Sequence, residues 1–171
     1  MTSCFPSLQQ NFLMLQTTTL PSAIAQIVGN NANPMLQGNA YFYQVPYGGV
    51  LIEVEVCGLP PEPTTDSGFY GMHIHETGNC TPPFDKTGNH FNPTGQPHPI
   101  HEGDLPPLLG NHGYAYSVFY TQHFQLSDIL NRSLIIHSKP DDFTTQPSGN
   151  SGEKIGCGVI TEITATLFPI S

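Results

Sequence analysis

Short runs of apolar and β-branched residues recur along most of the chain, and turns rich in glycine, proline and asparagine separate them. In the run VLIEVEV at residues 50–56, two glutamates alternate with isoleucine and valine. A period of two predicts a strand with one buried face and one face in water. On this basis we expect about eight strands. The clearest lie at residues 23–28, 37–45, 50–56, 69–75, 114–121, 133–137 and 155–167.

Two segments lack this alternation. The first runs from about residue 76 to residue 112 and the second from residue 138 to residue 154. Long irregular connections are unusual in a compact domain unless they carry function. Short strands combined with two long functional loops predict an all-β fold, an antiparallel Greek-key sandwich or flattened barrel. Residues 127–130 (SDIL) predict a turn or a single helical turn.

The composition supports this fold class. The chain has 171 residues, of which 17 are glycine and 17 are proline, and only 10% are charged. This length is typical of one domain with a single core, and the many turn formers suit short strands better than a helical bundle. We expect residues 1–20 to form a polar N-terminal extension and residues 21–171 to form the domain. The extension lacks the basic start and the cleavage site of a signal peptide.

The charge balance limits the partners. With 4 Lys and Arg against 13 Asp and Glu, the formal net charge is -9. The basic patch that phosphate contacts require is missing, so we expect no nucleic-acid partner and no binding to anionic membranes. The sequence also contains no run of 18 apolar residues, so we expect no membrane span.

Histidines gather in one part of the chain. Residues 71–104 contain five of the eight histidines, and another ends the apolar run at residues 133–137. His73 and His75 are two residues apart on a predicted strand, so both imidazoles point to the same face. The candidate ligands are His73, His75, His90, His98, His101, Asp104 and His137. Such an ordered set is hard to obtain from a solvated surface, and it predicts a metal site. The number of candidate ligands is also sufficient for a second ion.

Five stretches resemble the copper/zinc superoxide dismutases, most closely the bacterial type. They read GMHIHETGNC, GNHFNP, HEGDLP, LSDILNRSLIIHSKPDD and GNSGEKIGCGVI, and the resemblance covers roughly residues 23–167. It implies a sandwich fold, copper and zinc as cofactors, and the disproportionation of superoxide to oxygen and hydrogen peroxide.

The resemblance also implies a role for each candidate ligand. By position, copper would bind His73, His75, His90 and His137, and zinc would bind His90, His98, His101 and Asp104. His90 would bridge the two ions, and it would take up a proton and return it to the forming peroxide. Imidazoles suit copper and zinc, and three nitrogens with one carboxylate suit a closed tetrahedral zinc site. Asp141 matches an aspartate that tethers one histidine from each site.

Two of the four cysteines match positions of the family and two do not. Cys80 and Cys157 match the disulfide within the family's subunit, which would tie the first long loop to the last strand. Cys57 ends a predicted strand and is expected to be a core or free thiol. Cys4 has no counterpart. His112 and His123 match no ligand position, and we expect them to be exposed or structural.

Two departures from the family pattern stand out. Only two residues separate His98 from His101, so the zinc loop is shorter than in typical members and the reach of both histidines is in question. Lys154 replaces the family's active-site arginine. We expect Lys154 to attract and orient the anionic substrate, but lysine lacks the guanidinium fork that holds an anion through paired hydrogen bonds.

Three other functions remain open at this point. A dismutase-like protein that binds zinc or copper without turnover would need the same ligands. A cupin-type metalloenzyme also carries an H-x-H pattern but requires a later glutamate, and here Glu76 directly follows His75 while Asn79 and Cys80 stand farther on. A structural or adhesive sandwich leaves the histidines unexplained. The sequence leaves the compartment and the choice between monomer and homodimer undecided.

Overall fold

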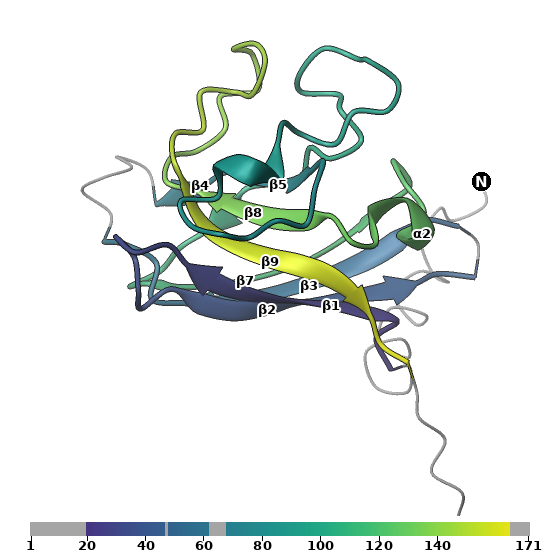
Figure 1. Cartoon of the computed structure of the whole chain (residues 1–171), viewed down its shortest axis with the longest axis horizontal. Coiled ribbons are helices and arrows are strands. Elements are labelled where there is room, and N and C mark those ends of the chain that lie inside the picture. Colours follow the sequence, from purple (N-terminus) through teal and green to yellow (C-terminus); the bar gives the residue numbers. More distant parts are fainter. Residues whose placement is uncertain (1–19, 47, 62–67, 165–171) are drawn as a thin grey trace, which may run out of the picture.

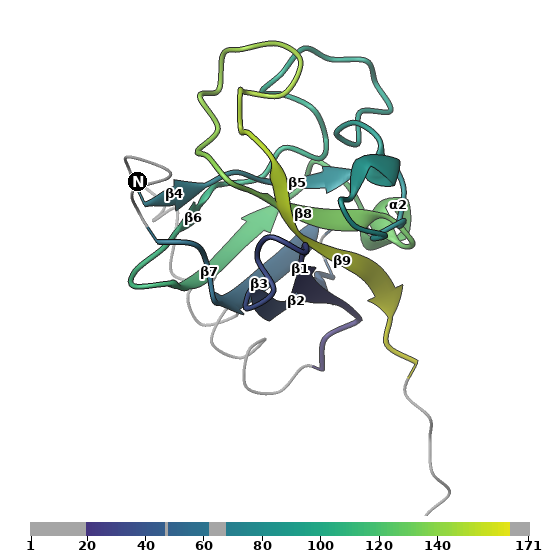
Figure 2. The same ribbon diagram turned by 60° about the vertical axis from the view of Figure 1, so that its left-hand side comes forward.

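The computed structural model describes residues 20–46, 48–61 and 68–164. Within these residues, seven strands form one antiparallel sheet in the order β5-β8-β9-β1-β2-β3-β7, and β4 pairs with β6 in a small second sheet. The strands are β1 (Ala23–Gly29), β2 (Gln37–Gln44), β3 (Val50–Cys57), β4 (Phe69–Tyr70), β5 (Met72–His75), β6 (Leu108–Leu109), β7 (Tyr114–Thr121), β8 (Ser133–His137) and β9 (Lys154–Glu162). The large sheet curls into a half-barrel (Figures 1 and 2), which confirms the predicted all-β fold.

The order of the strands follows from how the chain crosses the sheet. β1, β2 and β3 form a meander, β7 adds to β3, and the chain then crosses to β8 and β9, which return to the other side of β1. The alternation predicted for β3 is present, because Ile52 and Val54 are fully buried and Glu55 is exposed. The buried faces of these strands form one core. The single helical turn predicted at residues 127–130 is present as α2 (Leu126–Ile129).

The strand predicted at residues 69–75 is broken in two. β4 and β5 are separated by Gly71, whose N–H donates to Lys139 O at 2.7 Å and whose C=O accepts from His137 N at 2.8 Å. An added Cβ on Gly71 would lie 2.9 Å from Ser151 Cβ, so only glycine lets the second long loop approach this closely. The break releases β4 to pair with β6, a strand that the sequence predicts as loop.

The last strand is shorter than expected. β9 ends at Glu162, residues 163–164 continue without strand structure, and residues 165–167 of the predicted strand lie outside the described residues. Most of the expected N-terminal extension, with Cys4, also lies outside them. Among the described residues, no helix is both long and apolar enough to span a membrane.

A disulfide joins Cys80 in the first long loop to Cys157 in β9, as the resemblance implied. The two half-cystines have a sequence separation of 77, and a small buried cluster of Phe84, Ile135 and Cys157 packs around the bond. The disulfide therefore anchors the first part of the loop to the sheet. Cys57 is a free, exposed thiol.

Candidate metal centre

The candidate ligands meet at one edge of the large sheet. β5 is the edge strand and carries His73 and His75, and its neighbour β8 ends at His137. Both long loops rise on the same side of the sheet, over β5 and β8 (Figures 1 and 2). The first loop returns along β5, where isolated bridges pair His75 with His90 and His73 with Asp104. Ligands that are far apart in the sequence are thus brought together by backbone pairing.

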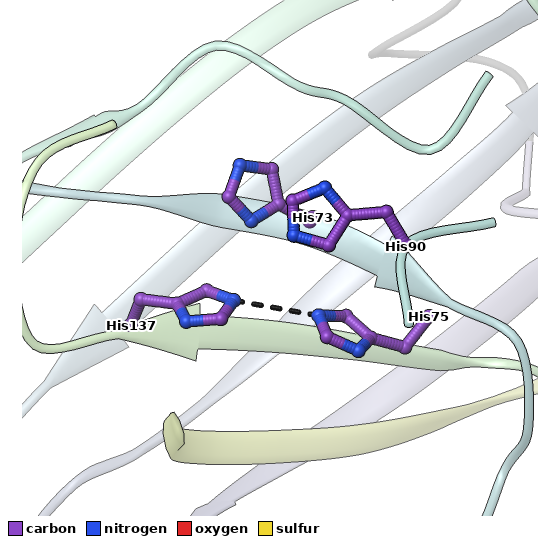
Figure 3. A group of neighbouring side chains, drawn as sticks. All are labelled: His73, His75, His90 and His137. Atoms are coloured by element: carbon purple, nitrogen blue, oxygen red, sulfur yellow. Dashed lines mark hydrogen bonds between the residues drawn. The ribbon is translucent and has the colours of Figure 1, made fainter. Parts of the chain in front are cut away.

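Within the described residues, two groups of four side chains lie close enough to hold an ion. In each group, all the candidate ligand atoms lie within 4.8 Å of one another. The first group is His73, His75, His90 and His137, and the second group is His90, His98, His101 and Asp104. All six histidines are buried. Figure 3 shows the four rings of the first group, which face one another across β5 and the end of β8.

His90 is shared by the two groups. Its Nδ1 lies 2.8 Å from Asp104 Oδ1 and 3.4 Å from His101 Nδ1, so this nitrogen faces the second group. Its Nε2 is buried and has no hydrogen-bond partner among the described residues, and its ring stacks on that of His73 with centroids 3.9 Å apart. One imidazole therefore offers a nitrogen to each group.

Hydrogen bonds to backbone carbonyls set the tautomers of His75 and His137. A carbonyl oxygen only accepts, so Nδ1–H of His75 donates to Gly88 O at 2.9 Å, and Nδ1–H of His137 donates to Gly152 O at 3.3 Å. Each ring then has its bare Nε2 on the inside, where the two atoms lie 3.4 Å apart. In a metal-binding histidine, one ring nitrogen usually donates a hydrogen bond that orients the ring, and the other nitrogen is unprotonated and faces the metal.

Asp141 links the groups from outside. Oδ2 lies 2.7 Å from His73 Nε2, and Oδ1 lies 2.9 Å from His98 Nε2. Both imidazoles donate, which leaves Nδ1 of each ring turned inward, and neither Nδ1 has a hydrogen-bond partner in the described part of the chain. Burial opposes ionisation of Asp141, but hydrogen bonds from His73, from Phe143 N and from His98 outweigh it and lower its pKa to about 2. Asp141 is therefore an anion that fixes one histidine of each group.

The short spacing between His98 and His101 still brings both rings to Asp104. His98 Nδ1 is 3.0 Å and His101 Nδ1 is 3.3 Å from Asp104 Oδ2. His98 Nδ1 is close to Asp104 Oδ2 but makes no hydrogen bond with it. Two ligand atoms that both point at one ion would show this geometry. Burial raises the pKa of Asp104, but the hydrogen bond from His90 and the nearby imidazoles outweigh it, so the net shift is downward.

Burial favours the neutral form of three histidines in the first group. It lowers the pKa of His73, His75 and His137, and the hydrogen bonds to Asp141, Gly88 and Gly152 offset this only in part. A metal binds the neutral form of imidazole, because the ligand nitrogen must be unprotonated. These three rings can thus each offer a nitrogen to an ion without first losing a proton from it.

Lys154 lies beside the first group. It is the first residue of β9 and pairs with His137 across a β-bulge, and its Nζ donates to Thr87 Oγ1 and to Gly88 O, both at 2.9 Å. Burial lowers the pKa of Lys154, and the carboxylates of Asp85 and Glu76 oppose this shift. The sequence pattern offered no signal for Thr87 or for the Gly88 carbonyl. His112 and His123 belong to neither group and are exposed.

Comparisons with known proteins agree with this geometry. The sequence model of the family described as copper/zinc superoxide dismutase (SODC) matches residues 36–160. Superoxide dismutase (Cu-Zn) 3 of Arabidopsis thaliana is 34% identical over 154 residues, which cover 81% of this chain and 88% of the relative. Bacterial dismutases are also among the relatives.

Two further similarities concern proteins with other descriptions. The copper chaperone for superoxide dismutase of Homo sapiens is 32% identical over 166 residues, which cover 90% of this chain and 57% of the chaperone. The structure of a double mutant of a SOD-like protein from Bacillus subtilis has a TM-score of 0.68 at 31% identity, over 81% of this chain and 96% of that chain. With the family match over most of its length, this chain belongs to the copper/zinc superoxide dismutases, a family that uses copper and zinc.

Proposed function

We propose that this protein disproportionates superoxide, so that two superoxide anions and two protons give one dioxygen and one hydrogen peroxide. One observation carries the proposal: a single buried imidazole, that of His90, belongs to both ligand groups. The assignment is copper at His73, His75, His90 and His137, and zinc at His90, His98, His101 and Asp104. A copper and zinc pair bridged by one imidazole requires a ring shared in this way.

The donor atoms suit these two ions. The first group consists of imidazole nitrogens, which copper accepts readily, and the second adds one carboxylate to three imidazoles, a set typical of closed zinc sites. When bound, copper would supply the one-electron chemistry, taking an electron from one superoxide and giving it to the next. The inward Nδ1 of His73 and Nε2 of His90, which lack hydrogen-bond partners among the described residues, support the fit.

His90 and Lys154 would perform the steps that belong to the protein. Nε2 of His90 is the atom on which the ring takes up a proton, and from there the proton passes to the forming peroxide. The Nδ1 protons of His75 and His137 are held by backbone carbonyls, so those rings keep their orientation meanwhile. The ammonium group of Lys154 attracts the anion to the first group and orients it.

The second candidate function is copper binding or transfer without turnover. The similarity to the human copper chaperone, which covers 90% of this chain, is the observation that favours it. Against it stands the complete first group, since all four histidines are present and buried. Reconstituting the protein with copper and zinc, counting both metals and measuring superoxide decay in the same sample would decide. Two ions per chain with no acceleration of decay would support the second candidate.

Lys154→Glu should lower the rate of superoxide decay roughly tenfold or more, because it replaces attraction by repulsion beside the first group. Lys154→Arg should raise the rate, because the guanidinium orients an anion through two donors. Stopped-flow measurements on metal-loaded protein at several salt concentrations would check both. Wild type should show a shallow salt dependence, since salt screens the repulsion by the net charge of -9 as well as the local attraction.

Lys139→Glu makes the same change of charge at an exposed lysine and serves as the control. It should change the rate by less than about twofold, because the Lys139 side chain is exposed and its charge is screened by water and salt. Equal losses in both variants would mean that net charge rather than the place of Lys154 sets the rate. An unchanged rate in Lys154→Glu with full copper content would remove Lys154 from the mechanism.

A further inference from the structure

The loop before His90 places a buried threonine next to Lys154. Thr87 ends the short turn η2 (Asp85–Thr87) and is fully buried. Its N–H donates to Phe84 O at 3.1 Å, and its C=O accepts from Thr77 N at 3.0 Å. Hydrogen bonds thus fix both the N–H and the C=O of Thr87, so its side chain starts from a fixed backbone position.

The neighbours of the Thr87 hydroxyl group determine which hydrogen bond it donates and which it accepts. The ammonium group of Lys154 is a donor and cannot accept, so Thr87 Oγ1 accepts from Lys154 Nζ at 2.9 Å. The hydroxyl proton must then go elsewhere, and it goes to Phe84 O at 2.7 Å. The two hydrogen bonds therefore run in one direction, from Lys154 through Thr87 to Phe84. Together they resist rotation of the hydroxyl and of the ammonium group.

A second bond connects the same ammonium group to the first ligand group. Gly88 O accepts from Lys154 Nζ at 2.9 Å and from His75 Nδ1 at 2.9 Å. Gly88 has φ 77°, and a Cβ at this position would collide with Glu76 Oε2, so only glycine turns this carbonyl toward both donors without strain. Two of the three N–H groups of Lys154 are then engaged. The described residues provide no hydrogen-bond partner for the third.

The frame of these bonds is attached to the sheet. Phe84 is fully buried against Ile135 and Cys157, and the Cys80–Cys157 disulfide lies in the same cluster. Cys157 is in β9, the strand that begins at Lys154. Both ends of the hydrogen bond between Thr87 and Lys154 are therefore anchored to one strand.

We propose that Thr87 is a positioning residue that holds the Lys154 ammonium group beside the copper ligands and leaves one N–H for an anion. A guanidinium group carries direction in its planar fork, whereas a lysine side chain is a point charge on a flexible stem. In this chain, the hydrogen bonds to Thr87 and Gly88 supply the missing direction. The inference rests on the proposed function in that it takes the first group to hold copper and to receive an anion.

Azide binding to the copper- and zinc-loaded protein tests the inference without turnover. Thr87→Val removes the hydroxyl at nearly constant volume and should raise the dissociation constant for azide about fivefold, the factor that one ordinary hydrogen bond represents. Thr87→Ser keeps the hydroxyl and should bind azide within about twofold of wild type. The copper absorption band would follow the titration, with melting temperature and metal content measured on each sample. Thr87→Ala is a second variant without the hydroxyl and should weaken binding like Thr87→Val.

A double substitution shows whether the effect passes through Lys154. In the background of Lys154→Met, Thr87→Val should have no further effect on azide binding, because the group it positions is gone. Lysine side-chain NMR on ¹⁵N-labelled protein adds a readout that needs no copper. The chain has three lysines, Lys86, Lys139 and Lys154, and only the last should gain mobility in Thr87→Val.

The outcomes separate this inference from the proposed function. Three results would each overturn the inference, even in an active dismutase. They are wild-type azide affinity in Thr87→Val, equal losses of azide affinity in Thr87→Ser and Thr87→Val, and an undiminished effect of Thr87→Val in the Lys154→Met background. Inactive wild-type protein with the expected azide and NMR results would instead overturn the function and leave the positioning role standing.

Discussion

Cys157→Ser should lower the free energy of unfolding by about 4.5 kcal/mol, because the disulfide closes a loop with a sequence separation of 77 residues. For a domain of this size, that loss corresponds to a fall of roughly 10–15 °C in melting temperature. The metal centre should loosen as well, because Phe84, which directly precedes the turn η2 before His90, packs against the half-cystines. Calorimetry of the metal-free protein under oxidising conditions would measure the first effect, and zinc affinity would measure the second.

Cys57→Ser is the matched control, since it removes the same atom from an exposed thiol that forms no disulfide. Its expected effect is within about 0.5 kcal/mol. If the two variants melt within about 2 °C of each other, the disulfide contributes little to the stability of the native chain. If mass analysis of oxidised wild type pairs Cys57 with Cys80, the loop argument is wrong from the start.

The strands that alternate most regularly were predicted best. In β3, buried isoleucine and valine alternate with glutamate, and the adjacent β2 and β7 pair with it in regular antiparallel register. The H-x-H spacing also located one ligand pair, because β5 puts His73 and His75 on the same face. Period-two reasoning works here because each of these strands has one face in the core.

Features that depend on contacts between distant segments were not predictable from the pattern. Gly71 breaks the strand at residues 69–75 because the second long loop approaches its backbone, and the freed β4 pairs with β6. Pairing at the edge of β5 also places His90 beside His75 and Asp104 beside His73. No local periodicity carries this information, since the partners lie up to about 80 residues away.

The β-bulge between β8 and β9 is a third example. Gly156 pairs with Ile136, but His137 pairs with Lys154, so Ile155 is the extra residue of the bulge. Ile155 points into the core, and Lys154 lies opposite His137, the proposed copper ligand at the end of β8. Bulges next to functional sites commonly redirect a side chain in this way. Strict alternation along residues 154–162 does not predict such a placement.

Asp141 gives the prediction with the largest expected effect on metal binding. Its two oxygens accept from His73 and His98, which leaves Nδ1 of both rings unprotonated for an ion. Asp141→Asn preserves the shape of the side chain but replaces one acceptor with an NH₂ donor. The amide oxygen should remain where Asp141 Oδ1 is now, because that atom accepts from Phe143 N at 2.7 Å and from His98 at 2.9 Å. The NH₂ group then faces His73 Nε2, and two donors cannot share that contact.

His73 must therefore move its proton to Nδ1 or turn away, and either change removes a ligand from the first group. We expect Asp141→Asn to weaken copper binding by about 10- to 100-fold and zinc binding by less, since His98 keeps its acceptor. Titration against chelators of known affinity would measure both metals. Asp142→Asn makes the same change of charge one residue later and should leave both affinities within about twofold. Among the described residues, the Asp142 carboxylate accepts only from Thr144 and Thr145. Equal losses of copper and zinc in Asp141→Asn, or a similar loss in Asp142→Asn, would show that charge rather than the tautomer of His73 controls the site.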